Sequence, residues 1–228
     1  MIPRHHLPDD FLLSYAQGGL SEPWELAAAT HLTFCPTCRR TTERFERLGG
    51  DVLSGEQPVE MRPDAMSEVL AMLDKAPRES VATITRTDGE RERVAAGESS
   101  GRPVFPMALQ RVAGGDVEDV KWRSVGGGVS QLVLVEDNES VARLLRIPPN
   151  MAVPEHGHAG LEITLTLSGS FSDQGKTFAR GDVQVEDEET EHQPIADAGA
   201  VCVCLAVTNA PLKFRNWLPR LAQRFSGI

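Results

Sequence analysis

The sequence predicts a two-domain α + β protein in which a small helical domain precedes an all-β domain. Three observations lead to this prediction. Apolar residues recur at helical spacing up to about residue 75, a charged stretch with glycine and serine follows, and short alternating apolar runs fill the rest. The expected division is a helical domain over 1–85, a linker over 86–105 and a β-barrel domain over 106–228. A chain of 228 residues is long enough for each half to bury its own core.

Four helices are expected in the N-terminal domain. The first covers 10–16 and ends before a glycine pair, and the second begins near Ser21 and runs through LAAATHL. The third starts at Pro36 and ends at Gly49-Gly50. The fourth covers 63–75, with its apolar residues on one stripe.

Short strands are expected after the linker. Runs such as QLVLVE, VARLLRI, LEITLTLSG and VCVCLAV alternate with Gly, Pro, Asn and Asp. Several short strands at this spacing are typical of a sandwich or a barrel. The segment 212–225 is expected to form a short amphipathic element that packs on the barrel.

The charge and hydropathy of the chain exclude several function classes. A net charge of −10 opposes non-specific nucleic-acid binding, which needs Lys and Arg at the phosphates, and favours a basic partner. No apolar run approaches the roughly 20 residues of a membrane span. The N-terminus, MIPRHHLPDD, lacks the apolar core of a signal peptide, so we expect a cytoplasmic protein without membrane contact.

The N-terminal domain carries the spacing His31-x3-Cys35-x2-Cys38. Two thiolates and one imidazole suit Zn²⁺, and a fourth ligand is available from the His5-His6 pair. Pro36 should interrupt the helix between these ligands, so the metal would join two helices. A redox-active thiol pair and a plain buried cysteine pair are the alternatives.

The β domain carries a second set, His156-x-His158-x3-Glu162, followed by Gly169. The three residues share parity, so an extended strand would direct them to one face, together with Thr164 and Thr166. A later strand near FARGDVQVE would bring His192 to the same place. Three imidazoles and a carboxylate bind Zn, Fe, Mn, Cu or Ni, and the ligand types do not choose among these metals.

Two further features accompany this set. The acidic run at 186–191 is interpreted as a solvated loop that could raise the pKa of His192. Cys202 and Cys204 point the same way on a strand, either as small core residues or as a signal-sensitive thiol pair.

These motifs resemble two known families. The first set and its surroundings resemble the zinc-binding anti-sigma factors, and the second matches the cupin motifs, although Ala179 replaces an expected proline and the final histidine comes late. Their combination resembles the ChrR-type zinc-binding anti-sigma factors over nearly the whole chain. The similarity includes RHH, ATHL-x2-C-x2-C, DVKWRSVGGGV, HGHAGLEITL and LPRLAQRF.

The resemblance implies a four-helix zinc domain that inhibits an extracytoplasmic-function sigma factor in a 1:1 heterodimer, and a cupin barrel that releases it under singlet oxygen or other oxidative stress. It implies regulation of transcription and no enzymatic activity. The implied ligands of a structural zinc are His6, His31, Cys35 and Cys38. The implied ligands of zinc or another divalent transition metal in the cupin are His156, His158, Glu162 and His192.

Two alternative functions are weighed against this regulator. A metal-loaded cupin can be a dioxygenase or an isomerase with an accessory helical domain. Enzymes of that kind need acid/base and substrate-anchoring groups, whereas the face beside the ligands offers Thr164 and Thr166 and no evident arginine. A redox switch acting only through Cys35 and Cys38 would leave the second metal set unexplained. The regulator is therefore preferred.

Overall fold

The computed structural model describes residues 2–75, 103–210 and 213–214. Nearly all of the expected linker at 86–105 lies outside these residues. Of the expected amphipathic element at 212–225, only Lys213–Phe214 are described, and they form strand β12.

The described residues contain five helices, one more than expected. Four precede residue 76: α1 (Asp9–Ala16), α2 (Glu22–Phe34), α3 (Pro36–Gly55) and α4 (Ala65–Lys75). The fifth, α6 (Met107–Ala113), lies at the start of the β part, so the expected all-β C-terminal domain is wrong in this respect. Helix α6 begins after Pro106 and ends at Gly114, whose φ of +82° suits the left-handed residue that closes many helices.

Helix α3 extends beyond its predicted end. The Gly49-Gly50 pair was expected to stop it, but neither glycine has a positive φ and the helix continues to Gly55. A glycine ends a helix only where the backbone turns into the left-handed region, as it does at Gly18 after α1 (φ +67°).

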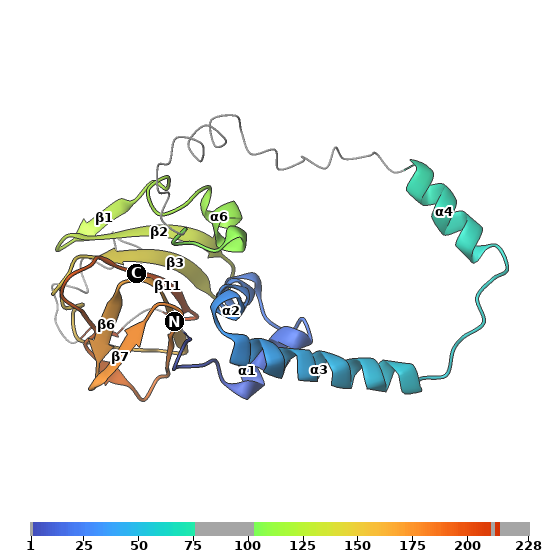
Figure 1. The fold of residues 1–228 in the computed structure, drawn as a ribbon, viewed down its shortest axis with the longest axis horizontal. Helices are drawn as coiled ribbons and strands as arrows, with labels where there is room; N and C mark the ends of the chain where they lie inside the picture. Colours follow the sequence, from blue (N-terminus) through green and yellow to red (C-terminus); the bar gives the residue numbers. More distant parts are fainter. Residues whose placement is uncertain (1, 76–102, 211–212, 215–228) are drawn as a thin grey trace. The chain divides into compact units, whose positions relative to one another are not determined.

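The β part forms three antiparallel sheets among the described residues, not one closed barrel (Figure 1). The largest has the order β1-β2-β3-β11-β5-β8, with bounds Arg123–Gly126, Val129–Glu136, Val141–Ile147, Cys202–Thr208, Glu162–Ser168 and Val183–Glu186. The second has the order β10-β6-β7, with bounds Ile195–Ala196, Ser170–Asp173 and Lys176–Ala179. The third has the order β12-β4-β9 and includes β4 (His156–Gly157) and β9 (Glu191–His192).

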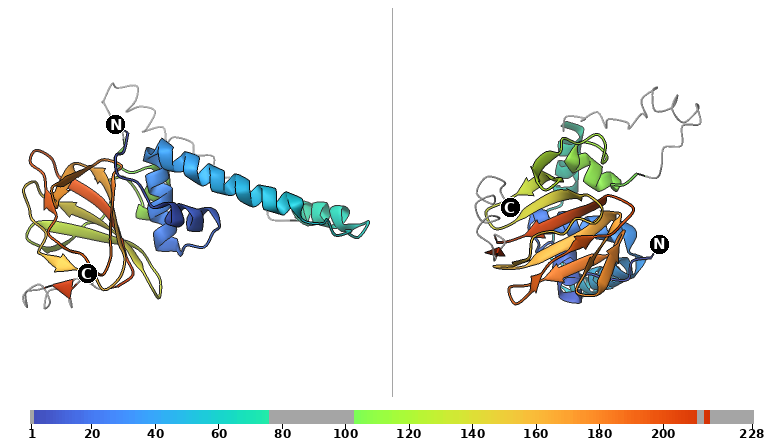
Figure 2. Two further views of the ribbon diagram at one scale, coloured as in Figure 1. Left: turned by 90° about the horizontal axis from the view of Figure 1, so that it is seen from below. Right: turned by 90° about the vertical axis from the view of Figure 1, so that its left-hand side faces the viewer.

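The six-stranded sheet buries a different core on each face. One face packs against the helices: Leu144, Leu165 and Leu205 join a cluster that also includes residues of α1, α2 and α6. Helix α2 contacts β3 and β11 directly, and the left view of Figure 2 shows it beside the strands. The other face packs against the second sheet, where Ile147, Cys202 and Cys204 meet Phe171 and Phe178. The apolar alternation of the strands is thus satisfied on both sides.

The chain divides into two compact units that differ from a simple split into helices and strands. One unit comprises 1–49 and 104–228, and the other comprises 50–103. Helices α1 and α2 and the part of α3 up to Gly49 therefore share a unit with the β part. The boundaries predicted at 85/86 and 105/106 remain a proposal about where the two folds meet in the sequence.

Candidate metal centres

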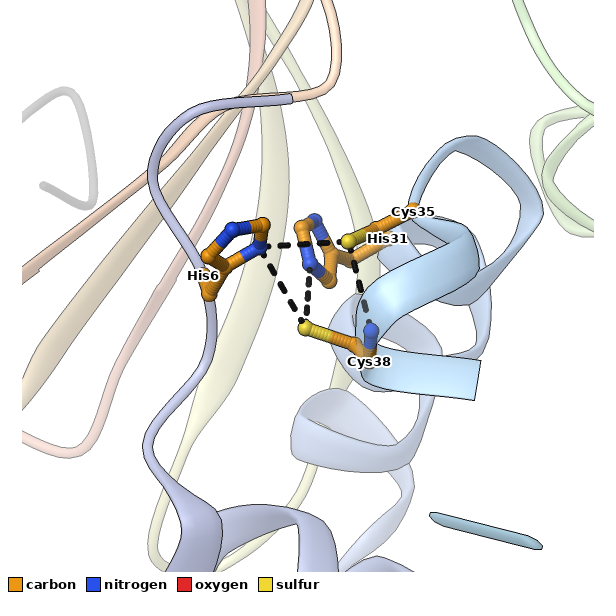
Figure 3. A group of neighbouring side chains, drawn as sticks. All are labelled: His6, His31, Cys35 and Cys38. Carbon is orange, nitrogen blue, oxygen red and sulfur yellow. Dashed lines mark hydrogen bonds between the residues drawn. The ribbon is translucent and has the colours of Figure 1, made fainter. Parts of the chain in front are cut away.

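The first candidate centre brings together His6, His31, Cys35 and Cys38 (Figure 3). His31 lies in the last turn of α2, Cys35 lies between α2 and α3, and Cys38 lies in the first turn of α3. His6 comes from the extended segment before α1. His6 Nδ1 is 3.2 Å from Cys35 Sγ, and His31 Nε2 is 3.2 Å from Cys38 Sγ.

The geometry of this cluster fits a tetrahedral zinc ion. Ligand atoms around zinc at bond lengths of about 2.0–2.3 Å lie about 3.3–3.8 Å apart. The two nitrogen–sulfur distances of 3.2 Å and the 3.7 Å between Cys38 Sγ and His6 Nδ1 are close to these values. His6, and not His5, faces the thiols: His5 instead lies 3.5 Å from Asp182 Oδ1 and contacts the Phe178 ring.

The electrostatics of the cluster also favour a cation. Burial, helped by the neighbouring Cys35, raises the pKa of the Cys38 thiol to about 12, so without a cation the thiol stays protonated. Burial lowers the pKa of His31 to about 4, so its imidazole is neutral and able to coordinate at neutral pH. A bound Zn²⁺ would deprotonate the thiols and use the neutral imidazoles directly.

The second candidate centre brings together His156, His158, Glu162 and His192, all buried. His192 Nε2 lies 3.0 Å from His156 Nε2 and 3.1 Å from His158 Nε2, and Glu162 Oε2 lies 3.7 Å from His158 Nδ1. Nitrogen atoms bound at about 2.1 Å to a single ion lie about 3.0–3.4 Å apart. The three imidazoles therefore fit one shared metal ion.

These ligands reach the centre by a different route from the one the sequence analysis expected. They do not share one strand: His156 lies on β4 and Glu162 on β5, in different sheets. His192 does not come from the strand at FARGDVQVE but from β9, which pairs directly with β4 in the register His156↔His192. The extra residues before His192 form an exposed turn over 187–189. The parity argument holds within β5, where Thr164 shares the face of Glu162 and bonds to its carboxylate.

Hydrogen bonds outside the second centre orient its imidazoles. His156 Nδ1 donates to Pro154 O at 2.8 Å, and His192 Nδ1 donates to Asp173 Oδ2 at 2.7 Å, so both Nε2 atoms face the centre. Gln184 Nε2 donates to the same Asp173 oxygen at 2.6 Å. Asp173 and Glu186 form a further acidic group with His192, in which Asp173 acts as a hydrogen-bond acceptor.

A buried arginine lies in this region, although the sequence analysis expected none beside the ligands. Arg143 on β3 pairs with Ala206 on β11, which in turn pairs with Thr164 on β5. Burial lowers the pKa of Arg143, and the charge of Glu162 partly offsets this effect. Burial also raises the pKa of Glu162. Strand order and register bring these residues together, and neither can be read from the run VARLLRI alone.

Cys202 and Cys204 are fully buried in the second core, with their Sγ atoms 3.5 Å apart. The side-chain hydrogen bond to Cys202 and burial raise the pKa of Cys204 well above its ordinary value. The raised pKa keeps the buried Cys204 thiol protonated at neutral pH.

Sequence reasoning did not identify Asp173, Gln184 or Arg143 as neighbours of the second centre. For Asp173 the sequence offered only a weak signal, because it stands just before the Gln174-Gly175 turn that joins β6 to β7. The burial of its carboxylate is visible only in the structure. Gly181 and Asp182 lie in the FARGDVQVE run, and the sequence did not indicate their contacts with His31 and with the segment before His6.

Comparisons with known proteins found a family and two similar chains. Residues 110–211 match the family model of the ChrR cupin-like domain. The whole chain is 41% identical to the anti-sigma-E factor ChrR of Cereibacter sphaeroides, covering 100% of both sequences. In structure it is similar to a chain from the crystal structure of Rhodobacter sphaeroides SigE in complex with the anti-sigma ChrR, with a TM-score of 0.73 and 38% identity over 90% of this chain and 98% of that chain.

Proposed function

This chain belongs to the family of ChrR-type anti-sigma factors, and on that premise we propose that it binds and inhibits an extracytoplasmic-function sigma factor in a 1:1 complex. We further propose that oxidative stress, with singlet oxygen as the signal, releases the sigma factor and so regulates transcription. The observation that carries the proposal is the full-length similarity to ChrR and to a chain solved together with SigE.

The described surface offers an apolar face that suits a protein partner. Helix α4 buries none of its residues. Four of its large apolar side chains recur at the i, i+3, i+4, i+7 spacing and are each more than half exposed: Met66, Val69, Leu70 and Leu73. Exposed apolar stripes of this kind mark surfaces that bind another protein, often in a groove. The net charge of −10 suits a basic partner.

We assign zinc to the first centre, with His6, His31, Cys35 and Cys38 as its ligands. Two thiolates and two imidazoles in a closed tetrahedral set are typical of structural zinc, which supplies folding free energy to small domains. In this chain the ligands join the segment before α1 to the α2–α3 junction, so the ion would hold three elements of the helical part together.

We assign zinc or another divalent transition metal to the second centre, held by His156, His158, Glu162 and His192. Four protein ligands leave room for further ligands on many transition metals, which makes such an ion accessible to small oxidants. We propose that this centre senses the signal together with the Cys202/Cys204 pair, because Cys204 interacts electrostatically with Glu162.

No described helix is long and apolar enough to cross a membrane. We propose that the protein acts in the cytoplasm, where its proposed sigma-factor partner acts.

A metal-dependent enzyme is the alternative, and Arg143 near Glu162 is the observation that favours it, since an arginine can anchor an anionic substrate. The relative that matches over its whole length is named an anti-sigma factor, so we assign a regulatory role. Turnover of a substrate by the metal-loaded protein, without sigma-factor binding, would reverse this choice.

The experiment is co-purification with an extracytoplasmic-function sigma factor from the same genome, followed by a transcription assay with RNA polymerase. We expect a 1:1 complex and inhibition. Leu70→Asp on the apolar face of α4 should weaken binding about tenfold or more, as loss of an interface anchor does. Ala71→Asp places the same charge on another face of the helix and serves as the control. Absence of both binding and inhibition in the wild-type protein would refute the proposal.

A further inference from the structure

The turn between β7 and β8, at Gly181-Asp182, is hydrogen-bonded to one ligand of the first metal centre and to the segment that carries another. This turn belongs to the β part, whereas the centre belongs to the helical part. Both residues are buried. Their contacts reach one candidate ligand, His31, directly, and they reach the two residues that precede a second candidate ligand, His6.

The side chain of Asp182 holds the segment that carries His6. Its Oδ1 accepts hydrogen bonds from the backbone N–H groups of Arg4 at 2.6 Å and His5 at 3.0 Å. Its Oδ2 accepts from the backbone N–H of Ala179 at 2.9 Å, which fixes the carboxylate within its own turn. The backbone N–H of Val183 donates to His5 O at 3.4 Å. The residue before His6 is therefore bonded to the β part through both its N–H and its C=O.

Gly181 holds His31. The imidazole Nδ1 of His31 donates to Gly181 O at 2.9 Å, which turns Nε2 toward Cys38 Sγ. Gly181 has a φ of +90°, and a Cβ there would lie 2.9 Å from both Phe34 Cβ and Pro3 Cγ. Only glycine allows the turn to approach α2 and the N-terminal segment this closely.

From these contacts we infer that Gly181 and Asp182 are positioning residues for the first centre, so that its metal affinity depends on the β7–β8 turn. Partners that orient metal ligands from outside typically change metal affinity 10–100-fold when they are lost. The dependence is reciprocal, so metal binding should also stabilise the turn. Gln184, two residues further along β8, donates to Asp173, which orients His192. Strand β8 and the residue before it thus supply outer contacts to both centres: Asp182 to the first and Gln184 to the second.

Cobalt binding to the full-length protein tests this inference. Thiolate-to-cobalt charge-transfer absorption reports only the first centre, because the second has no cysteine ligand. We expect Asp182→Ala to weaken cobalt binding about tenfold or more. Arg4→Ala should have no effect, since only the backbone of Arg4 is used. Asp197→Ala is the matched control: that carboxylate likewise accepts hydrogen bonds through both oxygens, but from Ser170 and Ser172 within the β part.

A second pair of variants tests the same contact sterically. Gly181→Ala should weaken cobalt binding, because its methyl group meets Phe34 and Pro3. Gly175→Ala requires a similar left-handed backbone (φ +77°) but meets no atom within 4 Å, so it should bind cobalt normally. Equal affinity of Asp182→Ala and wild type, or of the two glycine variants, would overturn the inference.

Amide hydrogen exchange keeps the test decisive if Asp182→Ala does not fold. In a His156→Ala protein, zinc added to the first centre should slow exchange at the Val183 amide, which donates to His5 O. An unchanged exchange rate would contradict the inference. None of these measurements involves a partner protein, so their failure is separate from failure of the proposed anti-sigma function.

Discussion

At the scale of single residues, the buried thiols of the first centre are the groups most dependent on a metal ion. Cys35 and Cys38 are 0% and 2% exposed, and two imidazole nitrogens lie within 3.7 Å of their sulfur atoms. In the absence of an ion, this arrangement buries polar groups with few good hydrogen-bond partners, which costs free energy. A zinc ion would satisfy all four groups at once.

We therefore predict that Cys35→Ser or Cys38→Ser removes one of two bound metal ions and lowers the unfolding temperature of the helical part. The reason is that each variant removes one of four ligands from a structural site. Metal analysis and thermal unfolding followed by circular dichroism measure the two effects. Cys202→Ala, which removes an equally buried thiol outside the centre, is the control and should retain both ions. Full zinc retention by the Cys35 and Cys38 variants would contradict the assignment.

At the scale of elements, α2 and α3 differ in how much of each helix is buried by tertiary contacts. Helix α2 is buried on several sides because it packs between α1, α6 and the six-stranded sheet. Helix α3 buries only Cys38 and Thr42 and exposes its second half. Gly49 and Gly50, in this second half, have no atom within 4 Å of a Cβ placed on them and no left-handed φ. They weaken the helix without serving a turn.

We predict that Gly49→Ala stabilises α3 by about 0.5–1 kcal/mol, because alanine loses less backbone entropy in a helix. The added methyl group meets no atom within 4 Å. Gly18→Ala is the opposite case, because its φ of +67° penalises any side chain, and it should destabilise the protein by about 1 kcal/mol. Thermal unfolding of both variants decides the matter, and destabilisation by Gly49→Ala would show that the helix ends where the sequence first indicated.

At the scale of the whole molecule, the helical part and the β part share one hydrophobic core. Leu12 of α1 and Leu26 of α2 lie in the same cluster as Leu144 and Leu205 of the sheet. A hydrophobic core that takes residues from both parts is characteristic of one folding unit, and not of two domains that meet only through a linker.

Cleavage of the chain tests this shared core. With a protease site inserted between residues 85 and 95, we expect the two fragments to co-elute in gel filtration after cleavage and to separate only in denaturant. The apolar face of α2 would otherwise become exposed. Fragments that separate under native conditions would show that the contact between α2 and the sheet is weak.

The proposed separation of two roles, inhibition by the helical part and sensing by the second metal centre, is also a property of the whole molecule. We predict that His156→Ala or Glu162→Ala leaves inhibition intact but blocks the response to singlet oxygen, because the proposed partner surface on α4 is remote in sequence from the second centre. A sigma-dependent reporter, with and without photosensitiser and light, measures both properties. Glu189→Gln, an exposed residue of the acidic run, is the control. A normal light response in the His156 variant would remove the sensing role from this centre.

The sequence by itself determined most of the helices, the main strands and the chemical types of the candidate ligands. Helical and strand periodicities reflect contacts between near neighbours, so α1, α2, α4 and the main strands could be predicted. His31, Cys35 and Cys38 are also close in sequence, and their spacing was enough to indicate a metal. The end of α3 was misplaced, because Gly49 acts as a stop only in a backbone conformation that it does not adopt here.

The family resemblance named His6 and His192, but only the tertiary structure shows how these distant residues reach each centre. His6 joins Cys35 across 29 residues, and His192 joins His156 across 36. The pairing of β4 with β9, the approach of Arg143 to Glu162 and the contact of Asp182 with the N-terminal segment depend on strand register and on the packing of α2 against the sheet. Register and packing are selected by the burial of the whole core, and so no local pattern in the sequence encodes them.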